Sequence, residues 1–323
     1  MIDACGRSID YLRISITDRC NLRCVYCMPE GMVRTFSHDE ILRYEEITRL
    51  VRLMTGLGIK HLRITGGEPT VRQHWLRLLE MLGAVPGIET MALTTNALLL
   101  DGRVDEIRAA GVTALNISID SLDPDVYRDM TRGGDVSKVL RVVDDAVNAG
   151  LRVKLNAVPV KGLNENGLVA LARMAKDRPI DVRFIELMPI GCGRELAPIA
   201  SDEVLRRMEA AFGPLAKDDT VHGFGPARYG KPEGFRGSIG IISPLSHEFC
   251  GQCNRVRLTA DGYLKLCLNH TAGLDLRAML RQGATDAELL SAIREAIAHK
   301  PDRHGWYDPI KDRENRRMNA IGG

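Results

Sequence analysis

Short runs of apolar, often β-branched residues alternate with amphipathic stretches from about residue 10 to residue 188. Short apolar runs between turn residues are typical of buried strands, and apolar positions that recur every three or four residues indicate helices. We predict strands at Leu12 to Thr17, His61 to Thr65, Thr90 to Thr94, Ala114 to Ile119, Arg152 to Val158 and Val182 to Glu186. We predict helices at Asp39 to Leu57, Gln73 to Leu82, Val104 to Ala110, Val136 to Ala149 and Glu165 to Ala175, three of which end near a glycine, at Gly58, Gly111 and Gly150.

The regular alternation of strand and helix predicts a parallel α/β sheet. Polar motifs fall at the ends of the predicted strands, and barrel enzymes gather their functional residues at the carboxyl ends of their strands. Six units are too few to close an eight-stranded barrel, so the pattern predicts an open (β/α)6 partial TIM barrel. A doubly wound fold is less favoured because no dinucleotide-binding glycine motif follows the first strand.

The second part of the chain has a different pattern. Residues 190–240 are rich in glycine and proline and contain one helical run, Asp202 to Ala211. Farther on, Asp261-Gly262 is a strong hairpin signal. We therefore expect the partial barrel over residues 1–190, and over residues 191–323 a C-terminal α+β extension that covers its open side.

Composition limits the classes of function. The chain has 323 residues, of which 45% are hydrophobic and 27% charged, so it can bury a full core. The net charge of +2 gives no reason to expect binding to nucleic acid or to membranes. No run reaches the ~18 apolar residues of a membrane span, and the first residues lack the apolar core of a signal peptide. We expect a cytoplasmic protein whose eight cysteines serve as metal ligands or free thiols, not as disulfides.

Cys20, Cys24 and Cys27 place three thiols on one short loop after the first predicted strand. Thiolates select iron–sulfur clusters or zinc over hard cations. A [4Fe-4S] cluster takes four ligands, so three cysteines leave one iron open to another ligand. Structural zinc is the alternative, although it prefers four closed protein ligands, and no fourth cysteine or histidine lies near this loop.

The segment from Ser15 to Pro29 closely resembles the cluster-binding loop of radical S-adenosylmethionine (SAM) enzymes. In that family the open iron is chelated by SAM, and the reduced cluster cleaves SAM to a 5'-deoxyadenosyl radical. The segment Thr65-Gly66-Gly67-Glu68-Pro69 resembles the glycine motif of the same family, although a tight turn alone would also explain the glycine pair. The resemblance implies that SAM is contacted by Tyr26, Gly67, Ser118 and Met188.

A second group of three cysteines, Cys250, Cys253 and Cys267, flanks the predicted hairpin. Their spacing allows two interpretations, because His270 follows closely and could complete a tetrahedral zinc site. The segment from Asn254 to Gly262, however, resembles the C-terminal motif of the GTP 3',8-cyclases, which are one family of radical SAM enzymes. That resemblance implies a second [4Fe-4S] cluster, whose open iron binds the guanine base of GTP.

Two arginines support this interpretation. Alternation along a strand places Arg255 and Arg257 on one face, and a triphosphate is best held by several guanidinium groups, which grip its oxygens bidentately. The resemblance implies that GTP is contacted by Arg13, Arg63, Thr94, Lys154, Arg255 and Arg257. It also implies that the C-terminal Gly322 and Gly323 reach into the active site as catalytic elements, whereas terminal glycines are otherwise usually frayed.

The resemblance implies the first step of molybdenum cofactor biosynthesis. GTP would become (8S)-3',8-cyclo-7,8-dihydroguanosine 5'-triphosphate, with 5'-deoxyadenosine and methionine as co-products. An external electron donor would reduce the clusters, the product would pass to the enzyme that forms cyclic pyranopterin monophosphate, and a homodimer is compatible with the family.

Two other functions stay open at this point. The first is a radical SAM maturase that modifies a peptide and uses the C-terminal cysteines for auxiliary clusters. The second is a binding module that is stabilised by two zinc ions. Cys5 and Cys192 belong to neither cysteine group, and we expect each to be a small packed residue or a free thiol.

Overall fold

Twelve strands form one sheet, in the order β12-β11-β10-β1-β2-β3-β4-β5-β6-β9-β8-β7. The computed structural model describes residues 1–306, 314 and 316–322. The centre of the sheet consists of β1 (Tyr11–Ser15), β2 (His61–Thr65), β3 (Thr90–Thr95), β4 (Ala114–Ser118), β5 (Arg152–Ala157) and β6 (Asp181–Ile185). Each neighbouring pair among these six strands is parallel. The six predicted strands and their parallel order are therefore confirmed.

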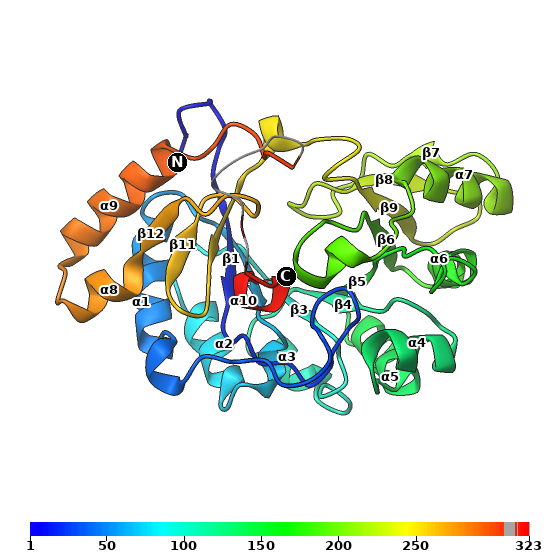
Figure 1. Cartoon of the computed structure of the whole chain (residues 1–323), viewed down its shortest axis with the longest axis horizontal. Helices are drawn as coiled ribbons and strands as arrows, with labels where there is room; N and C mark the ends of the chain where they lie inside the picture. Colours follow the sequence, from blue (N-terminus) through cyan, green and yellow to red (C-terminus); the bar gives the residue numbers. More distant parts are fainter. Residues whose placement is uncertain (307–313, 315, 323) are drawn as a thin grey trace.

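The helices that connect these strands along the chain lie outside the curve of the sheet (Figure 1). They are α1 (Tyr44–Thr55), α2 (Trp75–Gly83), α3 (Val104–Ala109), α4 (Pro124–Thr131), α5 (Val136–Asn148) and α6 (Leu168–Asp177). Five of them match the predicted helices, and α4 was not predicted. The predicted start of α1 at Asp39 is wrong, because Asp39 lies in a separate 3-10 turn, His38–Glu40. Extended residues separate this turn from α1, and the backbone N–H of Leu42 donates to the carbonyl oxygen of Ala260. A local pattern cannot show such a long-range contact.

The C-terminal part of the chain extends the sheet at both edges. Strand β9 (Ser238–Ile242) pairs in parallel with β6, and β10 (Arg255–Leu258) pairs in parallel with β1. Antiparallel strands follow outward, β8 (Arg228–Lys231) and β7 (Ala216–Lys217) on one side, β11 (Tyr263–Lys265) and β12 (Gly273–Asp275) on the other. Within the described ranges β9 and β10 do not pair with each other, so the predicted open, partial barrel is confirmed.

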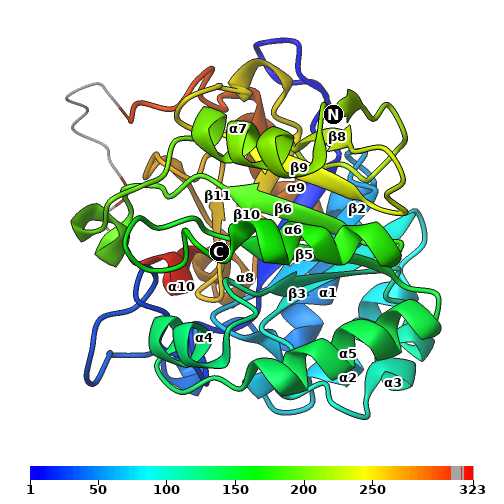
Figure 2. The ribbon, with the colours of Figure 1, turned by 90° about the vertical axis from the view of Figure 1, so that its right-hand side faces the viewer.

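The remaining helices are α7 (Ser201–Phe212), α8 (Leu276–Arg281), α9 (Asp286–Ala298) and α10 (Met318–Ile321). Figure 2 shows α7 beside α6 and α5 on the outside of the sheet. Figure 1 places α8 and α9 beyond β12, whereas the short α10 lies inside the curve of the sheet, close to β1. The end of the chain thus reaches the inner face that the barrel strands enclose.

Side chains on the parallel strands alternate between two environments. In β1, Leu12 and Ile14 are fully buried in the core between the sheet and the helices. Arg13 lies between them and faces the inside of the curve, and Arg63 does the same on β2. Because every second residue points to the same face, each strand supplies the core with one set of residues and the inner face with the other.

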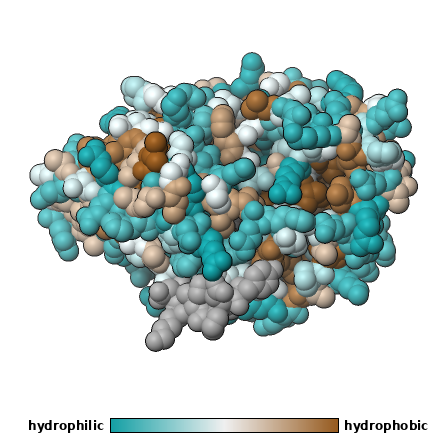
Figure 3. All heavy atoms as spheres, turned by 90° about the horizontal axis from the view of Figure 1, so that it is seen from above, coloured by the Kyte–Doolittle hydropathy of each residue, from teal (hydrophilic) through white to brown (hydrophobic). Residues whose placement is uncertain are grey.

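Most of the surface seen from above is hydrophilic, and apolar groups are confined to a few patches (Figure 3). None of the described helices combines the length and the apolar character that a membrane span requires. The apolar residues are instead concentrated in one large core that runs along the whole sheet.

Candidate active site

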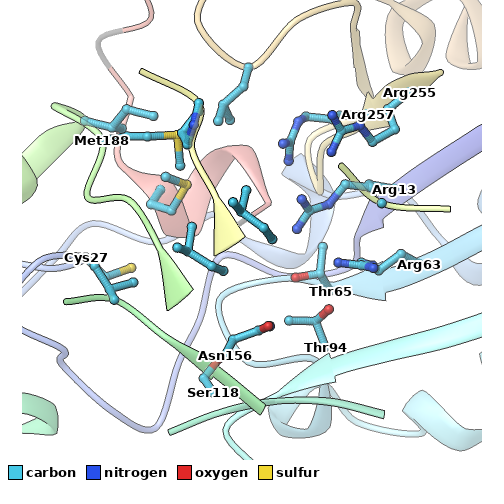
Figure 4. Close-up of a pocket in the computed structure, with 18 of the residues that line it drawn as sticks. Arg13, Cys27, Arg63, Thr65, Thr94, Ser118, Asn156, Met188, Arg255 and Arg257 are labelled. Atoms are coloured by element: carbon cyan, nitrogen blue, oxygen red, sulfur yellow. The ribbon is translucent and has the colours of Figure 1, made fainter. Parts of the chain in front are cut away.

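One cavity of about 340 Å³ lies inside the curve of the sheet. Nearly all the predicted site residues line it: Arg13, Cys20, Cys24, Tyr26, Cys27, Arg63, Gly67, Thr94, Ser118, Met188, Cys250, Cys253, Arg255, Arg257 and Cys267. Figure 4 shows that four arginines gather on one side, whereas Cys27 and Met188 lie on the other and Ser118 near the base of the view. Segments from both parts of the chain therefore meet around one space.

The loop after β1 carries the first three cysteines. Burial raises the pKa of Cys20 to about 11 and that of Cys27 to about 12, and it raises the pKa of Cys24 well above its usual value. Two backbone N–H groups, those of Leu22 and Asn319, donate to the Cys20 and Cys27 sulfurs. Three partly buried thiols that converge on one cavity fit an iron–sulfur cluster, which would take them as thiolates and neutralise their charge.

Gly66 and Gly67 let this cysteine loop pack directly on the end of β2. The N–H of Gly67 donates to the carbonyl oxygen of Thr17 over 2.7 Å, and that of Glu68 donates to Arg19 over 2.8 Å. A Cβ on Gly67 would lie 2.4 Å from the Arg19 carbonyl oxygen, which is closer than real contacts allow. The glycine pair therefore permits a close approach of two backbones, which is more than the tight turn that the sequence alone could explain.

Glu68 is a buried carboxylate that our sequence analysis did not single out. It accepts hydrogen bonds from the Thr70 and Thr95 hydroxyls and from the N–H of Asn96, the last over 2.7 Å. The Asn96 amide in turn donates to Asn21 on the cysteine loop. Burial raises the pKa of Glu68, although these donors oppose the shift. The Glu68 side chain thus links the ends of β2 and β3 to the cysteine loop.

Asp120 plays a similar part at the end of β4. It accepts a hydrogen bond from the Tyr26 hydroxyl over 2.8 Å and from the N–H of Val158 over 2.9 Å. Burial raises its pKa to about 6. Because Tyr26 lies between Cys24 and Cys27, this contact fixes the loop across the cavity floor. Glu68 lies within the quoted glycine motif, and Asp120 directly follows the predicted strand that ends at Ile119, which was the only local signal for either residue.

The second three cysteines border the same cavity. Burial raises the pKa of Cys250, whereas for Cys253 the charges of Arg255 and Lys300 outweigh burial and bring the pKa down to about 7. Arg7, which no sequence signal identified, donates to the Cys250 carbonyl oxygen over 3.0 Å. Its side chain also donates to the backbone around Lys300, so it ties the N-terminal segment to this cysteine loop.

His270, the histidine suggested by spacing, does not line the cavity, and its Nε2 hydrogen-bonds to the Arg303 carbonyl oxygen. His304 lies at the cavity instead, and its backbone N–H donates to Cys250. Ligand atoms of Glu248, Cys250 and His304 come within 4.8 Å of one another. The structure therefore supplies a different histidine at the second cysteine group from the one that the sequence suggested.

The arginines form a row across three strands. Arg257, Arg13 and Arg63 are register partners on β10, β1 and β2. Burial, followed by the nearby charges of Arg257 and Arg63, lowers the pKa of Arg13. In the described part of the chain, Arg63, Arg255 and Arg257 form no ion pair with a carboxylate. Uncompensated cations this close together indicate a binding site for a multiply charged anion.

Two more atoms point to a ligand. The Nε of Arg63 and the hydroxyl of Thr94 are buried, line the cavity and have no hydrogen-bond partner within the described residues. Buried polar groups without a partner cost stability, so their number in native proteins is small. We therefore expect a ligand to satisfy them.

Lys154 and Arg183 add two more cations close to Arg63. Lys154 is buried but does not line the cavity; burial and the Arg183 charge lower its pKa to about 7. Arg183 lines the cavity, and its guanidinium donates to the Asn156 and Asn116 side chains. Arg183 was not assigned from the sequence, although it belongs to the predicted strand Val182 to Glu186.

The C-terminal tail, described at residues 314 and 316–322, reaches the arginine row. The Arg257 guanidinium donates to the Gly322 carbonyl oxygen over 2.7 Å, and Gly322 is buried with φ at 77°. A Cβ at Gly322 would lie 3.0 Å from the Ser15 Cβ, so glycine suits both the backbone angle and the space. Gly322 itself does not line the cavity, and Gly323 lies outside the described residues.

Two sequence profiles match the chain. The Radical SAM superfamily matches residues 14–175, and Molybdenum Cofactor Synthesis C matches residues 180–306. A GTP 3',8-cyclase from Pelotomaculum thermopropionicum is 46% identical over 327 residues, and one from Clostridium perfringens is 40% identical over 323 residues. Each alignment covers 100% of both chains.

Solved structures share the fold at low identity. Streptococcus suis SuiB bound to S-adenosylmethionine matches with a TM-score of 0.60 and 15% identity, over 88% of this chain and 64% of that one. A second structure of SuiB matches with a TM-score of 0.64 and 14% identity, over 91% of this chain and 66% of that one. At this identity the likeness concerns the fold alone.

We predict that Gly67→Ala separates the cysteine loop from β2. The added Cβ would meet the backbone of Arg19 and Asp18, and such overpacking costs about 1–3 kcal/mol. Iron bound after anaerobic reconstitution and the free energy of unfolding should both fall. Gly225→Ala is the matched control, because no atom lies within 4 Å of its Cβ position. Equal iron content in Gly67→Ala and wild type would contradict the prediction.

Proposed function

Because this chain belongs to the radical SAM superfamily and, within it, to the GTP 3',8-cyclase family, we propose that the cavity inside the curve of the sheet holds SAM and GTP together. The reaction converts GTP to (8S)-3',8-cyclo-7,8-dihydroguanosine 5'-triphosphate, with 5'-deoxyadenosine and methionine as co-products, at the start of molybdenum cofactor biosynthesis. The observation that carries this proposal is that both three-cysteine groups and the arginine row line the same cavity. The source of the radical and the GTP that reacts with it can thus be held within one enclosed space.

The first cysteine group would hold a [4Fe-4S] cluster through Cys20, Cys24 and Cys27. When bound, that cluster supplies the electron that cleaves SAM. Gly67, with Tyr26, Ser118 and Met188, would position SAM beside it; all four line the cavity. Asp120 and Glu68 would position SAM only indirectly, because their side chains hold the loop and the strand ends in place.

The arginine row would hold the triphosphate of GTP. Arg13, Arg63 and Arg257 lie in register on adjacent strands, and Arg255 lies on the same face of β10 as Arg257. Thr94, Lys154 and Arg183 would complete the polar side. Binding at several points fixes the ribose relative to the radical source, and such positioning lowers the barrier of a reaction between two bound partners.

The second cysteine group would hold another [4Fe-4S] cluster through Cys250, Cys253 and Cys267. Three thiols beside the cavity, one of them with a pKa near 7, suit iron with one open position that faces the substrate. Zinc is the second candidate, because Glu248 and His304 approach Cys250 and would close such a site. Iron is favoured because all three thiols face the cavity.

We also propose the remaining roles that the family implies. Gly322 and Gly323 would act as catalytic elements near the arginine row, where Gly322 contacts Arg257. An external donor would reduce the clusters, the next enzyme of the pathway would take the product, and the chain could form a homodimer. The two matched profiles meet between residues 175 and 180, close to the boundary near residue 190 that we propose for the two parts.

The direct test is anaerobic reconstitution with iron and sulfide, followed by reductant and SAM. We expect 5'-deoxyadenosine to form with GTP and to match the amount of cyclised nucleotide. Formation that ignores GTP would move the substrate toward a peptide, and no formation in a colourless, zinc-loaded protein would overturn the proposal.

We expect the two cysteine groups to lose metal independently. Cys24→Ser and Cys253→Ser should each retain about four of the roughly eight irons of two clusters. Only Cys24→Ser should abolish SAM cleavage, because the first cysteine group would hold the cluster that cleaves SAM. Cys5→Ser, which removes an exposed thiol, is the control and should keep the full iron content. If Cys24→Ser retained zinc in place of iron, the proposal of a second [4Fe-4S] cluster would be contradicted.

Lys154 should make GTP binding depend on pH. Its pKa of about 7 in the free protein means that the amine is mostly neutral at higher pH, whereas a bound triphosphate favours the ammonium form. Binding therefore takes up a proton, and GTP affinity should fall by up to about tenfold per pH unit between about pH 7.5 and about pH 9. Calorimetry should show a flat profile for Lys154→Met, and the wild-type slope for the exposed control Lys161→Met. An unchanged slope in Lys154→Met would assign the proton to another group.

A further inference from the structure

A buried ion pair joins the sheet to the C-terminal tail. The Lys265 side chain on β11 is fully buried, and its ammonium pairs with the Glu314 carboxylate, which is also nearly inaccessible. Lys265 also donates to the His270 carbonyl oxygen. The Glu314 backbone N–H donates to the Asn269 carbonyl oxygen over 2.7 Å. Side chain and backbone therefore both hold Glu314 against the segment that follows β11.

The ion pair lies opposite the arginine that holds the end of the tail. Lys265 and Arg257 are direct register partners on the antiparallel pair β10 and β11. Arg257 donates to the Gly322 carbonyl oxygen, and Lys265 binds Glu314. Two neighbouring cations on one hairpin thus bind the tail at two points, one before α10 and one after it.

The tail between these points enters the cavity wall. Arg316 donates to Glu314 over 2.8 Å from its backbone and over 3.2 Å from its side chain, which turns the chain toward α10. Met318 and Asn319 line the cavity, and the Asn319 amide donates to the Asp18 carbonyl oxygen over 2.8 Å. Glu314 therefore comes before Met318 and Asn319 in the sequence, so the ion pair holds the tail just before these two residues enter the cavity wall.

The cost of burying these charges decides which part of the protein is displaced when the ion pair breaks. A buried ammonium without a partner is costly, whereas the Glu314 carboxylate would recover its hydration if the tail left the sheet. Breaking the pair therefore favours release of the tail over loss of the hairpin. The Arg316 guanidinium also pairs with both Glu314 oxygens and, over 3.5 Å, with Asp261. Because Arg316 belongs to the tail itself, its pairing with Glu314 cannot hold that residue against β11.

We propose that the Lys265–Glu314 ion pair is the anchor that seats the C-terminal tail in the active site. Both residues are positioning residues: neither lines the cavity, and they act by holding α10 and Gly322 at the arginine row. The functional part of this inference rests on the proposed role of the tail, whereas the seating itself does not.

Hydrogen exchange measured by mass spectrometry tests the seating in the full chain. Lys265→Met and Glu314→Gln should each raise the exchange rate of the peptide that covers residues 316–322 at least about tenfold, because the tail leaves its seat. Peptides of β10 and β11 should keep their protection. Lys300→Met is the matched control: it removes another buried lysine of this region, whose ammonium donates to the Leu266 carbonyl oxygen, and it should leave the tail peptide unchanged.

Three outcomes decide the proposal. Faster exchange confined to the tail in both variants supports it. Unchanged tail exchange in either variant overturns it, and so does loss of protection in β10 and β11 together with the tail, because the pair would then belong to the hairpin core. Lys265→Arg, which keeps the charge, should restore slow exchange in the tail.

Activity separates the anchor from the role of the tail. In the same preparations, GTP-dependent formation of 5'-deoxyadenosine should fall mainly through kcat, and the iron content should stay at the wild-type level. A chain that ends at residue 317 serves as the reference for a missing tail. If that chain is as active as wild type, the proposed role of Gly322 and Gly323 fails, while the exchange result still decides whether the ion pair seats the tail.

Discussion

The two-residue alternation of side chains on in-register parallel strands is the constraint on which this structure depends. It sends Leu12 and Ile14 into the core and turns Arg13 inward from the same strand. Because adjacent strands share the register, the inward arginines of β10, β1 and β2 form a row and do not scatter. A slip of one residue in β1 would bury Arg13 under the helices and expose Leu12 to the cavity. Core packing therefore fixes the geometry of the charged surface.

That charged surface is held at a cost. Like charges in buried, adjacent positions destabilise the protein, as the lowered pKa of Arg13 reflects through burial and the charges of Arg257 and Arg63. Binding sites commonly accept such destabilisation, because a ligand of opposite charge relieves it. The same reasoning applies to Arg63 and Thr94, whose buried polar atoms have no hydrogen-bond partner in the part of the chain that is described. We therefore expect a bound anion to stabilise the protein.

The features of the site that depend on neighbouring residues could be predicted from the sequence, whereas the contacts between distant segments could not. Cysteine spacing, the Gly66-Gly67 pair and the strand pattern each depend on a few neighbouring residues, and the radical SAM and GTP 3',8-cyclase resemblances that they carried are confirmed by the relatives. Arg7 could not be identified, because its partners near Cys250 and Lys300 are brought to it only by folding. Spacing suggested His270, whereas the fold brings His304 to Cys250. The strand β10 was expected within a hairpin, but its pairing with β1 is a property of the whole sheet.

The position of β10 and β9 at the two edges of the central sheet has a consequence for synthesis. Strand β1 has a free edge until Arg255 and its neighbours are made, since Tyr11 pairs with Arg255. An unpaired parallel edge is prone to join the wrong strand, and pairing between such distant segments is slow. We therefore expect the free edge of β1 to be the part of the nascent sheet that is most open to wrong pairing until β10 is made. Completion of the sheet and arrival of the second cysteine group then occur together, because β10 directly follows Cys253.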